Sequence, residues 1–196
     1  MSVMIGNWTP GIGDPSFLGW ATVFSYYGSA LVCLAAAIHT DKKQQSDDRT
    51  FWFTVFFIMA FLGVCKHFNL PSAITELGRI LARSEGWMQQ RRVVQVFIMS
   101  GAALGGLSAI MLLLRRIPSA IKKRHQMTLL CLFYIVAFVT FRTISFHSWE
   151  TVLSYRIFGL RVNWIGELAG IFGVCASVVG YWCGESLRLR KKSDGG

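Results

Sequence analysis

The amino-acid sequence predicts an all-α, polytopic transmembrane helix bundle with about five spans. Hydrophobic residues make up 53% of the 196 residues, and they are concentrated in runs of near-membrane length separated by charged residues. A bilayer core about 30 Å thick requires roughly 20 apolar residues in a helix. Because the backbone must satisfy its own hydrogen bonds in lipid, we interpret these runs as helices.

The chain divides into a polar arm (1–16), one transmembrane bundle (17–184) and a basic tail (185–196). Glycine and proline in the arm favour turns, and the tail is expected to fray. The second span is the shortest and is marginal for crossing alone at 1.5 Å per residue. Arg49 and Lys66 at its ends are expected to snorkel their charges outward and so lengthen it in effect. The five spans are expected at about 17–39, 51–65, 93–114, 127–141 and 163–184.

Two connecting segments, at about 70–88 and 145–158, are predicted to be amphipathic helices in the membrane interface. In the first, Pro71 suits the first helical turn, and Asn69 or Leu70 lies near the cap. Apolar residues recur on one face of this segment, namely Ile74, Leu77, Ile80 and Leu81. The opposite face carries Glu76, Arg79 and Arg83.

The formal net charge of +10 comes from Lys and Arg between the apolar runs, without a nucleic-acid-binding signature. We assign these charges to lipid head-group contact and to topology. They are densest in the loops 40–50 and 115–126 and in the tail, which lie on one side of a five-span bundle. The positive-inside rule therefore predicts an outside N-terminus and a cytoplasmic C-terminus.

The fifth span carries small residues at alternating spacings of four and three: Gly166, Gly170, Gly173, Ser177, Gly180 and Gly184. Such a small-residue seam lets helix backbones approach closely. Packing inside the bundle is its expected use, and association with a partner membrane subunit or a second copy of the chain is the alternative. Membrane lipids are expected partners, and nucleic acid is not.

Ionisable residues gather at the face that this orientation places outside, where each needs a partner or a function. Glu167, about one turn into the fifth span, is expected to pair with Arg142 or Arg161, or to be a general acid–base group or metal ligand. The candidate catalytic residues are His147, Glu150, Glu167 and Glu76. The residues suited to an anion or head group are Arg79, Arg83 and Arg142.

No cofactor is identified from the sequence. A metal ion is a weaker alternative, with His67, His147 and Glu150 as candidate ligands, because no spacing such as HExxH is present. His39 and His125 lie beside basic residues at the other face, and we expect them to be solvated loop histidines rather than haem ligands.

Several short motifs are spread over most of the chain: Gly13-Asp14-Pro15, Lys66-His67-Phe68-Asn69-Leu70, Thr75-Glu76-Leu77-Gly78-Arg79, Ser145-Phe146-His147 and Asn163-Trp164 with Glu167-Leu168. Together they resemble a family of small bacterial inner-membrane proteins without an assigned activity. The resemblance implies a bacterial inner-membrane location and no mechanism. Relatives are expected to carry a second histidine after His147 and an acidic residue two positions further on, where this chain has Ser148 and Glu150.

The sequence contains no nucleophile elbow, P-loop or dinucleotide fingerprint. The expected function is therefore a non-enzymatic accessory or scaffold subunit of a membrane assembly. The alternative is a membrane-embedded enzyme with an outward-facing His/Glu/Arg site that acts on a lipid or an anionic head group. A transporter is the least expected function, because no inverted repeat is visible.

Overall fold

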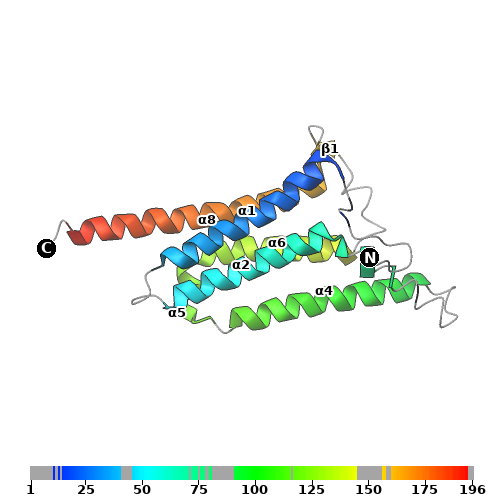
Figure 1. Cartoon of the computed structure of the whole chain (residues 1–196). Helices are drawn as coiled ribbons and strands as arrows, with labels where there is room; N and C mark the ends of the chain where they lie inside the picture. The colour runs from blue at the N-terminus through cyan, green and yellow to red at the C-terminus, as the bar shows by residue number, and fades with distance from the viewer. Residues whose placement is uncertain are drawn as a thin grey trace, which may run out of the picture.

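The protein is an all-α helix bundle, as predicted, with one short β-hairpin (Figure 1). The computed structural model describes residues 11, 13, 15–40, 46–70, 72–74, 76–77, 80, 91–115, 117–144, 156–157 and 160–193. The long helices are α1 (Phe17–His39), α2 (Ser46–His67), α4 (Arg91–Arg115), α6 (Gln126–Ile144) and α8 (Val162–Ser193). The shorter elements are helix α5 (Ser119–Arg124) and strands β1 (Arg156–Ile157) and β2 (Leu160–Arg161).

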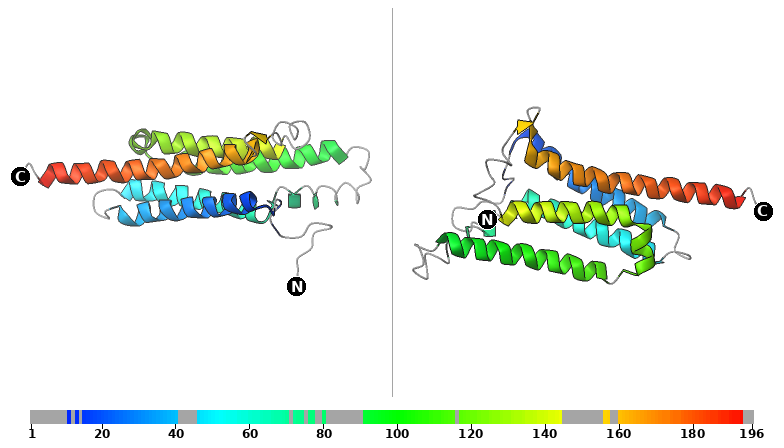
Figure 2. Two further views of the ribbon diagram at one scale, coloured as in Figure 1. Left: turned by 90° about the horizontal axis from the view of Figure 1, so that it is seen from above. Right: turned by 180° about the vertical axis from the view of Figure 1, so that it is seen from behind.

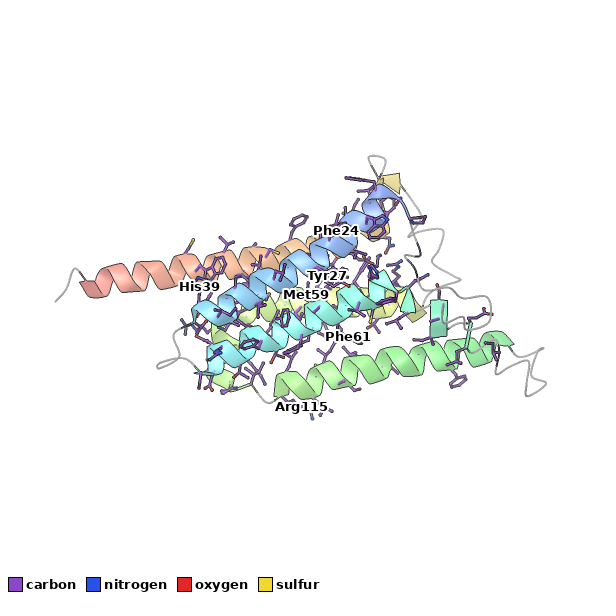
Figure 3. The ribbon with its side chains drawn as sticks, in the orientation of Figure 1. Phe24, Tyr27, His39, Met59, Phe61 and Arg115 are labelled. Atoms are coloured by element: carbon purple, nitrogen blue, oxygen red, sulfur yellow. The ribbon has the colours of Figure 1, made fainter. Side chains whose placement is uncertain are left out.

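Within the part of the chain that the structure describes, three helices are long and apolar enough to cross a membrane: α1, α2 and the part of α8 from Val162 to Gly184. The apolar part of α6, Gln126–Arg142, is shorter. Large apolar side chains cover the outside of the bundle, as the labelled Phe24 and Phe61 illustrate (Figure 3). Apolar residues on the outer surface match a lipid environment.

The long helices run side by side, with α1 and α2 on one side and α4, α6 and α8 on the other (Figure 2). Helix α1 packs against α2 and α8, and α6 packs against α8 and α4. The buried core includes Phe51, Met59, Ile135 and Val174, which come from α2, α6 and α8. Helix α1 begins at the N-cap Ser16, whose hydroxyl accepts a 3.2 Å hydrogen bond from the Gly19 backbone amide.

Helix α2 begins at Ser46, five residues before the expected start of the second span. The expected loop therefore contributes a first helical turn with Asp47 and Asp48, whose negative charges favour a helix N-terminus. The resulting 22 residues span about 33 Å at 1.5 Å per residue. The second span is thus long enough to cross a bilayer without assistance from snorkelling side chains.

The expected interfacial helix at 70–88 is helical at each residue that the structure describes between Leu70 and Ile80. Leu77 of the expected apolar face is exposed on the protein surface, as a lipid-facing side chain would be, whereas Ala73 and Glu76 are buried. A carboxylate beside lipid is costly, which favours the inward position of Glu76. Asn69 precedes this segment with φ 48°, a left-handed conformation that asparagine tolerates in turns.

The expected interfacial helix at 145–158 is wrong at its C-terminal end. Arg156 and Ile157 form strand β1, which pairs antiparallel with β2 in the register Arg156 to Arg161. Only Phe158 and Gly159 separate the strands in the sequence, and a two-residue connection containing glycine favours a hairpin. Residues 145–155 lie outside the described residues.

The tail, expected to fray, is helical through Ser193 as the end of α8, which extends past the other helices (Figure 1). Residues 185–193 contain no glycine or proline, and basic residues near a helix C-terminus interact favourably with its dipole.

The first four positions of the small-residue seam pack against α6, as expected. A β-carbon at Gly166 would lie 2.5 Å from the Phe138 ring, and one at Gly173 would lie 2.6 Å from the sulfur of Cys131. Ser177 accepts a 2.9 Å hydrogen bond from Thr128. In contrast, β-carbons at Gly180 and Gly184 would have no neighbour within 4 Å.

Candidate functional site

One end of the bundle holds a buried carboxylate between two cationic side chains. Lys66 donates to Glu167 through Nζ, at 3.1 Å from Oε1 and 2.8 Å from Oε2. Arg142 donates to Oε1 of the same carboxylate through Nη1. We call these three residues the Glu167 cluster. The ion pair with Arg142 was one of the two partners expected from the sequence, and Lys66 was not anticipated as the second.

The positions of the two cations along their helices favour their charge. Lys66 lies in the last turn of α2 and Arg142 in the last turn of α6, where the helix dipole favours cations. Glu167 lies in the second turn of α8, beyond the reach of that helix's dipole, so its charge depends on these two partners. Because α8 runs antiparallel to α2 and α6, the ends of these three helices meet, and the sequence places charges of opposite sign at the meeting point.

Burial makes this cluster energetically demanding. The Glu167 side chain is 1% exposed, that of Lys66 is 14% exposed and that of Arg142 is 36% exposed. A carboxylate removed from water is costly unless charge-assisted hydrogen bonds replace its hydration. Glu167 receives such bonds at both oxygens, whereas a third of the Arg142 side chain still reaches the surroundings.

Polar atoms near this cluster remain without partners among the described residues. His67 follows Lys66 in α2, and its Nδ1 atom is buried without a hydrogen bond there. Asn163, one turn before Glu167 in α8, has a buried Oδ1 atom in the same condition. The His67 ring meets Trp20 of α1 edge to face at 6.1 Å. Unpaired buried polar atoms are rare in folded proteins and often mark functional or hydrated sites.

The structure brings together only some of the predicted site residues. Arg142 and Glu167 are in contact, and His67 neighbours them through Lys66. Glu76 is buried, and it takes part in a hydrogen bond or a charge interaction. The side chains of Arg79, Arg83, His147, Glu150 and Arg161 lie outside the described residues. Among the residues that are described, no group of three His, Cys, Asp or Glu side chains could hold a metal ion.

The other end of the bundle contains a second ion cluster that sequence reasoning missed. Asp48 of α2 is fully buried; it accepts a hydrogen bond from Arg124 Nη1 and lies 3.0 Å from Nε2 of His125. We call Asp48, Arg124 and His125 the Asp48 cluster. The expectation that His125 is a solvated loop residue is therefore wrong, whereas His39 is exposed as expected.

Aromatic rings enclose the Asp48 cluster. The His125 ring stacks on Phe51 at 4.5 Å with an interplanar angle of 13°, and it meets Trp52 edge to face at 5.0 Å. Tyr181 of α8 packs against the same ring at 5.2 Å, and the Arg124 guanidinium lies over Tyr181 at 5.4 Å. This packing joins α2, the end of α5 and α8, and it shields the carboxylate from solvent.

Sequence reasoning missed the Asp48 cluster because it placed the start of the second helix too late. With the helix expected from residue 51, Asp48 belonged to a solvated loop. Starting the helix at Ser46 places Asp48 one turn before Trp52 on the buried face. The available signal was the pattern Ser46-Asp47-Asp48 ahead of an apolar run, which is typical of a helix N-terminus.

We compared the chain with protein-family models, with curated proteins and with solved structures, and none of the three comparisons gives a match.

Proposed function

We propose that this chain is a membrane protein that binds an anionic group, in particular a lipid head group, at the Glu167 cluster. The observation that carries the proposal is the partly exposed guanidinium of Arg142 beside Lys66, at the meeting point of three helix ends. Arg142 uses Nη1 for Glu167, and the planar guanidinium offers further donors suited to phosphate or carboxylate.

Charge and hydration support binding at this place. Two cations face one carboxylate in the cluster, so its three side chains sum to a positive charge. Nearby, the unpartnered Nδ1 of His67 is a donor for an anion in the tautomer that carries its proton, whereas Oδ1 of Asn163 is an acceptor and suits a water or a hydroxyl group. An anion that reached Arg142 would exchange hydration for charge-assisted hydrogen bonds.

The proposal is limited to binding. Both oxygens of Glu167 accept hydrogen bonds from Lys66 and Arg142, so Glu167 holds these two side chains in place. His147 and Glu150, the other residues of the enzymatic alternative, lie outside the described residues. The expected orientation puts the Glu167 cluster on the outer face of a bacterial inner membrane. A reporter enzyme that is active only outside the cytoplasm, fused after Gly196, should therefore be inactive.

Lipid retention tests the proposal directly. The full chain is purified from phosphatidylcholine nanodiscs that contain phosphatidylglycerol, and bound lipids are counted by native mass spectrometry. We expect Arg142→Gln to lower phosphatidylglycerol binding roughly tenfold, because it removes the exposed donor set. Arg115→Gln is the matched control, since Arg115 is exposed at the opposite end of the bundle. Equal losses in both variants, or no loss in either, would contradict the proposal.

A role as accessory subunit is the second candidate, favoured by one feature of α4. β-Carbons at Gly101, Gly105 and Gly106 would have no neighbour within 4 Å, so this small-residue face is open among the described residues. The same kind of face on α8 receives a helix, because Gly170 lies against Ile135 and Tyr134 of α6. We therefore favour one transmembrane helix of a partner protein as the occupant of the α4 face.

Complex size in mild detergent tests this second role. Gly105→Leu should convert a larger native complex into the isolated chain. Gly28→Leu is the control, because Gly28 of α1 is equally open and has Phe24 and Val32 four residues away. A native preparation that is already monomeric, or an equal effect of both substitutions, would refute the accessory role while leaving lipid binding untouched.

A further inference from the structure

Glu167 is an unexpected neighbour for an anion ligand. A carboxylate repels the same anions that Lys66 and Arg142 attract, and the repulsion acts over several ångströms in a partly hydrated site. Glu167 is 1% exposed and receives bonds from two helices, so it stays in place when a ligand arrives. Its effect on the ligand is therefore permanent.

The permanent charge discriminates between ligands of different charge. The attraction of an anion to the cluster rises in proportion to the charge of the anion, whereas the cost of removing the anion from water rises with the square of that charge. Glu167 cancels part of the attraction from Lys66 and Arg142. With the attraction reduced, the desolvation cost weighs more heavily against a doubly charged anion than against a singly charged one.

We propose that Glu167 is the specificity-determining residue of the site and that it selects singly charged phosphodiester head groups over phosphate monoesters. This inference rests on the proposed function. The depth of the site indicates that the phosphodiester belongs to a lipid. Trp20, 42% exposed, touches His67 beside Lys66, and exposed tryptophan marks the level of the head groups.

A competition between two lipids tests the selectivity. The full chain in phosphatidylcholine nanodiscs is offered equal amounts of phosphatidylglycerol, a monoanionic diester, and phosphatidic acid, a monoester. At pH 8 the monoester is largely doubly charged, since its second ionisation lies near pH 6 for phosphate monoesters. Native mass spectrometry should show the wild type binding mainly phosphatidylglycerol. Glu167→Gln should shift the ratio toward phosphatidic acid roughly tenfold, the effect of one charge at close range.

A charge-balanced variant separates selectivity from damage to the fold. Lys66→Gln combined with Glu167→Gln removes one positive and one negative charge, so the attraction returns toward its original value. This double variant should again prefer phosphatidylglycerol. If it prefers phosphatidic acid as strongly as Glu167→Gln does, charge does not determine the selectivity and the inference is wrong.

The remaining outcomes are equally decisive. A folded wild type that binds phosphatidic acid as well as phosphatidylglycerol, with a ratio that Glu167→Gln leaves unchanged, overturns the selectivity but leaves anion binding standing. Binding of neither lipid, or binding that Arg142→Gln does not reduce, overturns the proposed function itself. Displacement of phosphatidylglycerol by equimolar water-soluble glycerophosphoglycerol would overturn the lipid assignment and point to a soluble phosphodiester.

Discussion

At both ends of α2 a buried carboxylate meets two basic side chains from other helices. Asp48 and Lys66 are separated by 18 positions, or about 27 Å along the helix, so the Asp48 and Glu167 clusters lie far apart. The Asp48 cluster is enclosed by Phe51, Trp52 and Tyr181. The Glu167 cluster instead has a partly exposed arginine and unpartnered polar atoms beside it.

The difference teaches that a buried ion pair alone does not mark a site. Similar charges hold the helices together at one end, where aromatic rings exclude water. At the other end Arg142 is the more exposed arginine, with 36% of its side chain exposed against 25% for Arg124, and unpaired polar atoms lie beside it among the described residues. A ligand therefore meets more accessible donors at the Glu167 end. Removing one partner should therefore cost folding stability at the Asp48 end and ligand binding at the Glu167 end.

The largest effect on stability is expected from Asp48→Ala. The substitution leaves the Arg124 guanidinium without this counter-charge and Nε2 of the buried His125 without this partner, a change that typically costs about 3–5 kcal/mol. Thermal unfolding in detergent measures the loss. Asp47→Ala is the control, because Asp47 is the exposed neighbour in the same helical turn. Equal unfolding temperatures for the two variants would mean that the Asp48 cluster does not stabilise the packing of the helices.

A smaller effect is expected from the contact between α8 and α6 beside the Glu167 cluster. Gly166→Leu forces a side chain into the Phe138 ring of α6 and should cost about 1–3 kcal/mol by overpacking. Gly180→Leu, on the open part of the same seam, should leave the unfolding temperature unchanged. If Gly180→Leu destabilised the protein as much as Gly166→Leu, α6 would not be the partner of the seam.

The two histidines offer the finest comparison. His125→Phe keeps a ring in the aromatic enclosure but leaves Asp48 Oδ1 without this donor, at a cost of about 1–2 kcal/mol. His67→Phe should change stability by less than about 0.5 kcal/mol, because Nδ1 of His67 makes no hydrogen bond among the described residues. The unfolding temperatures of both variants in the same detergent test this expectation. A larger loss of stability from His67→Phe than from His125→Phe would contradict the assignment of the Asp48 cluster to folding and of the Glu167 cluster to binding.

The apolar runs were sufficient to predict the helices, because lipid leaves the backbone few alternatives. The charges at the helix ends were sufficient to single out Glu167 and Arg142. Lys66 and Asp48 were missed as partners for different reasons. Lys66 was interpreted as a snorkelling residue, since the sequence does not show which helix ends meet, and Asp48 was assigned to a loop because an apolar run does not define where its helix begins.

The burial of Glu76 in the segment at 70–80 also could not be derived from periodicity. The pattern predicts an apolar face and a charged face, but not which residues pack against the bundle. The structure exposes Leu77 of the apolar face and buries Glu76 of the charged face. The same ambiguity applies to the glycines of α4 and α8, which share a spacing but differ in whether a helix covers them.

The most direct test of the central claim is to locate the bound head group. A phosphatidylglycerol analogue with a photoreactive group on its head group is crosslinked to the full chain in nanodiscs, and the modified peptides are identified by mass spectrometry. We predict crosslinks beside Lys66 and Arg142 that unlabelled phosphatidylglycerol suppresses. Crosslinks confined to the Asp48 end, or spread evenly over both ends without suppression, would contradict the account.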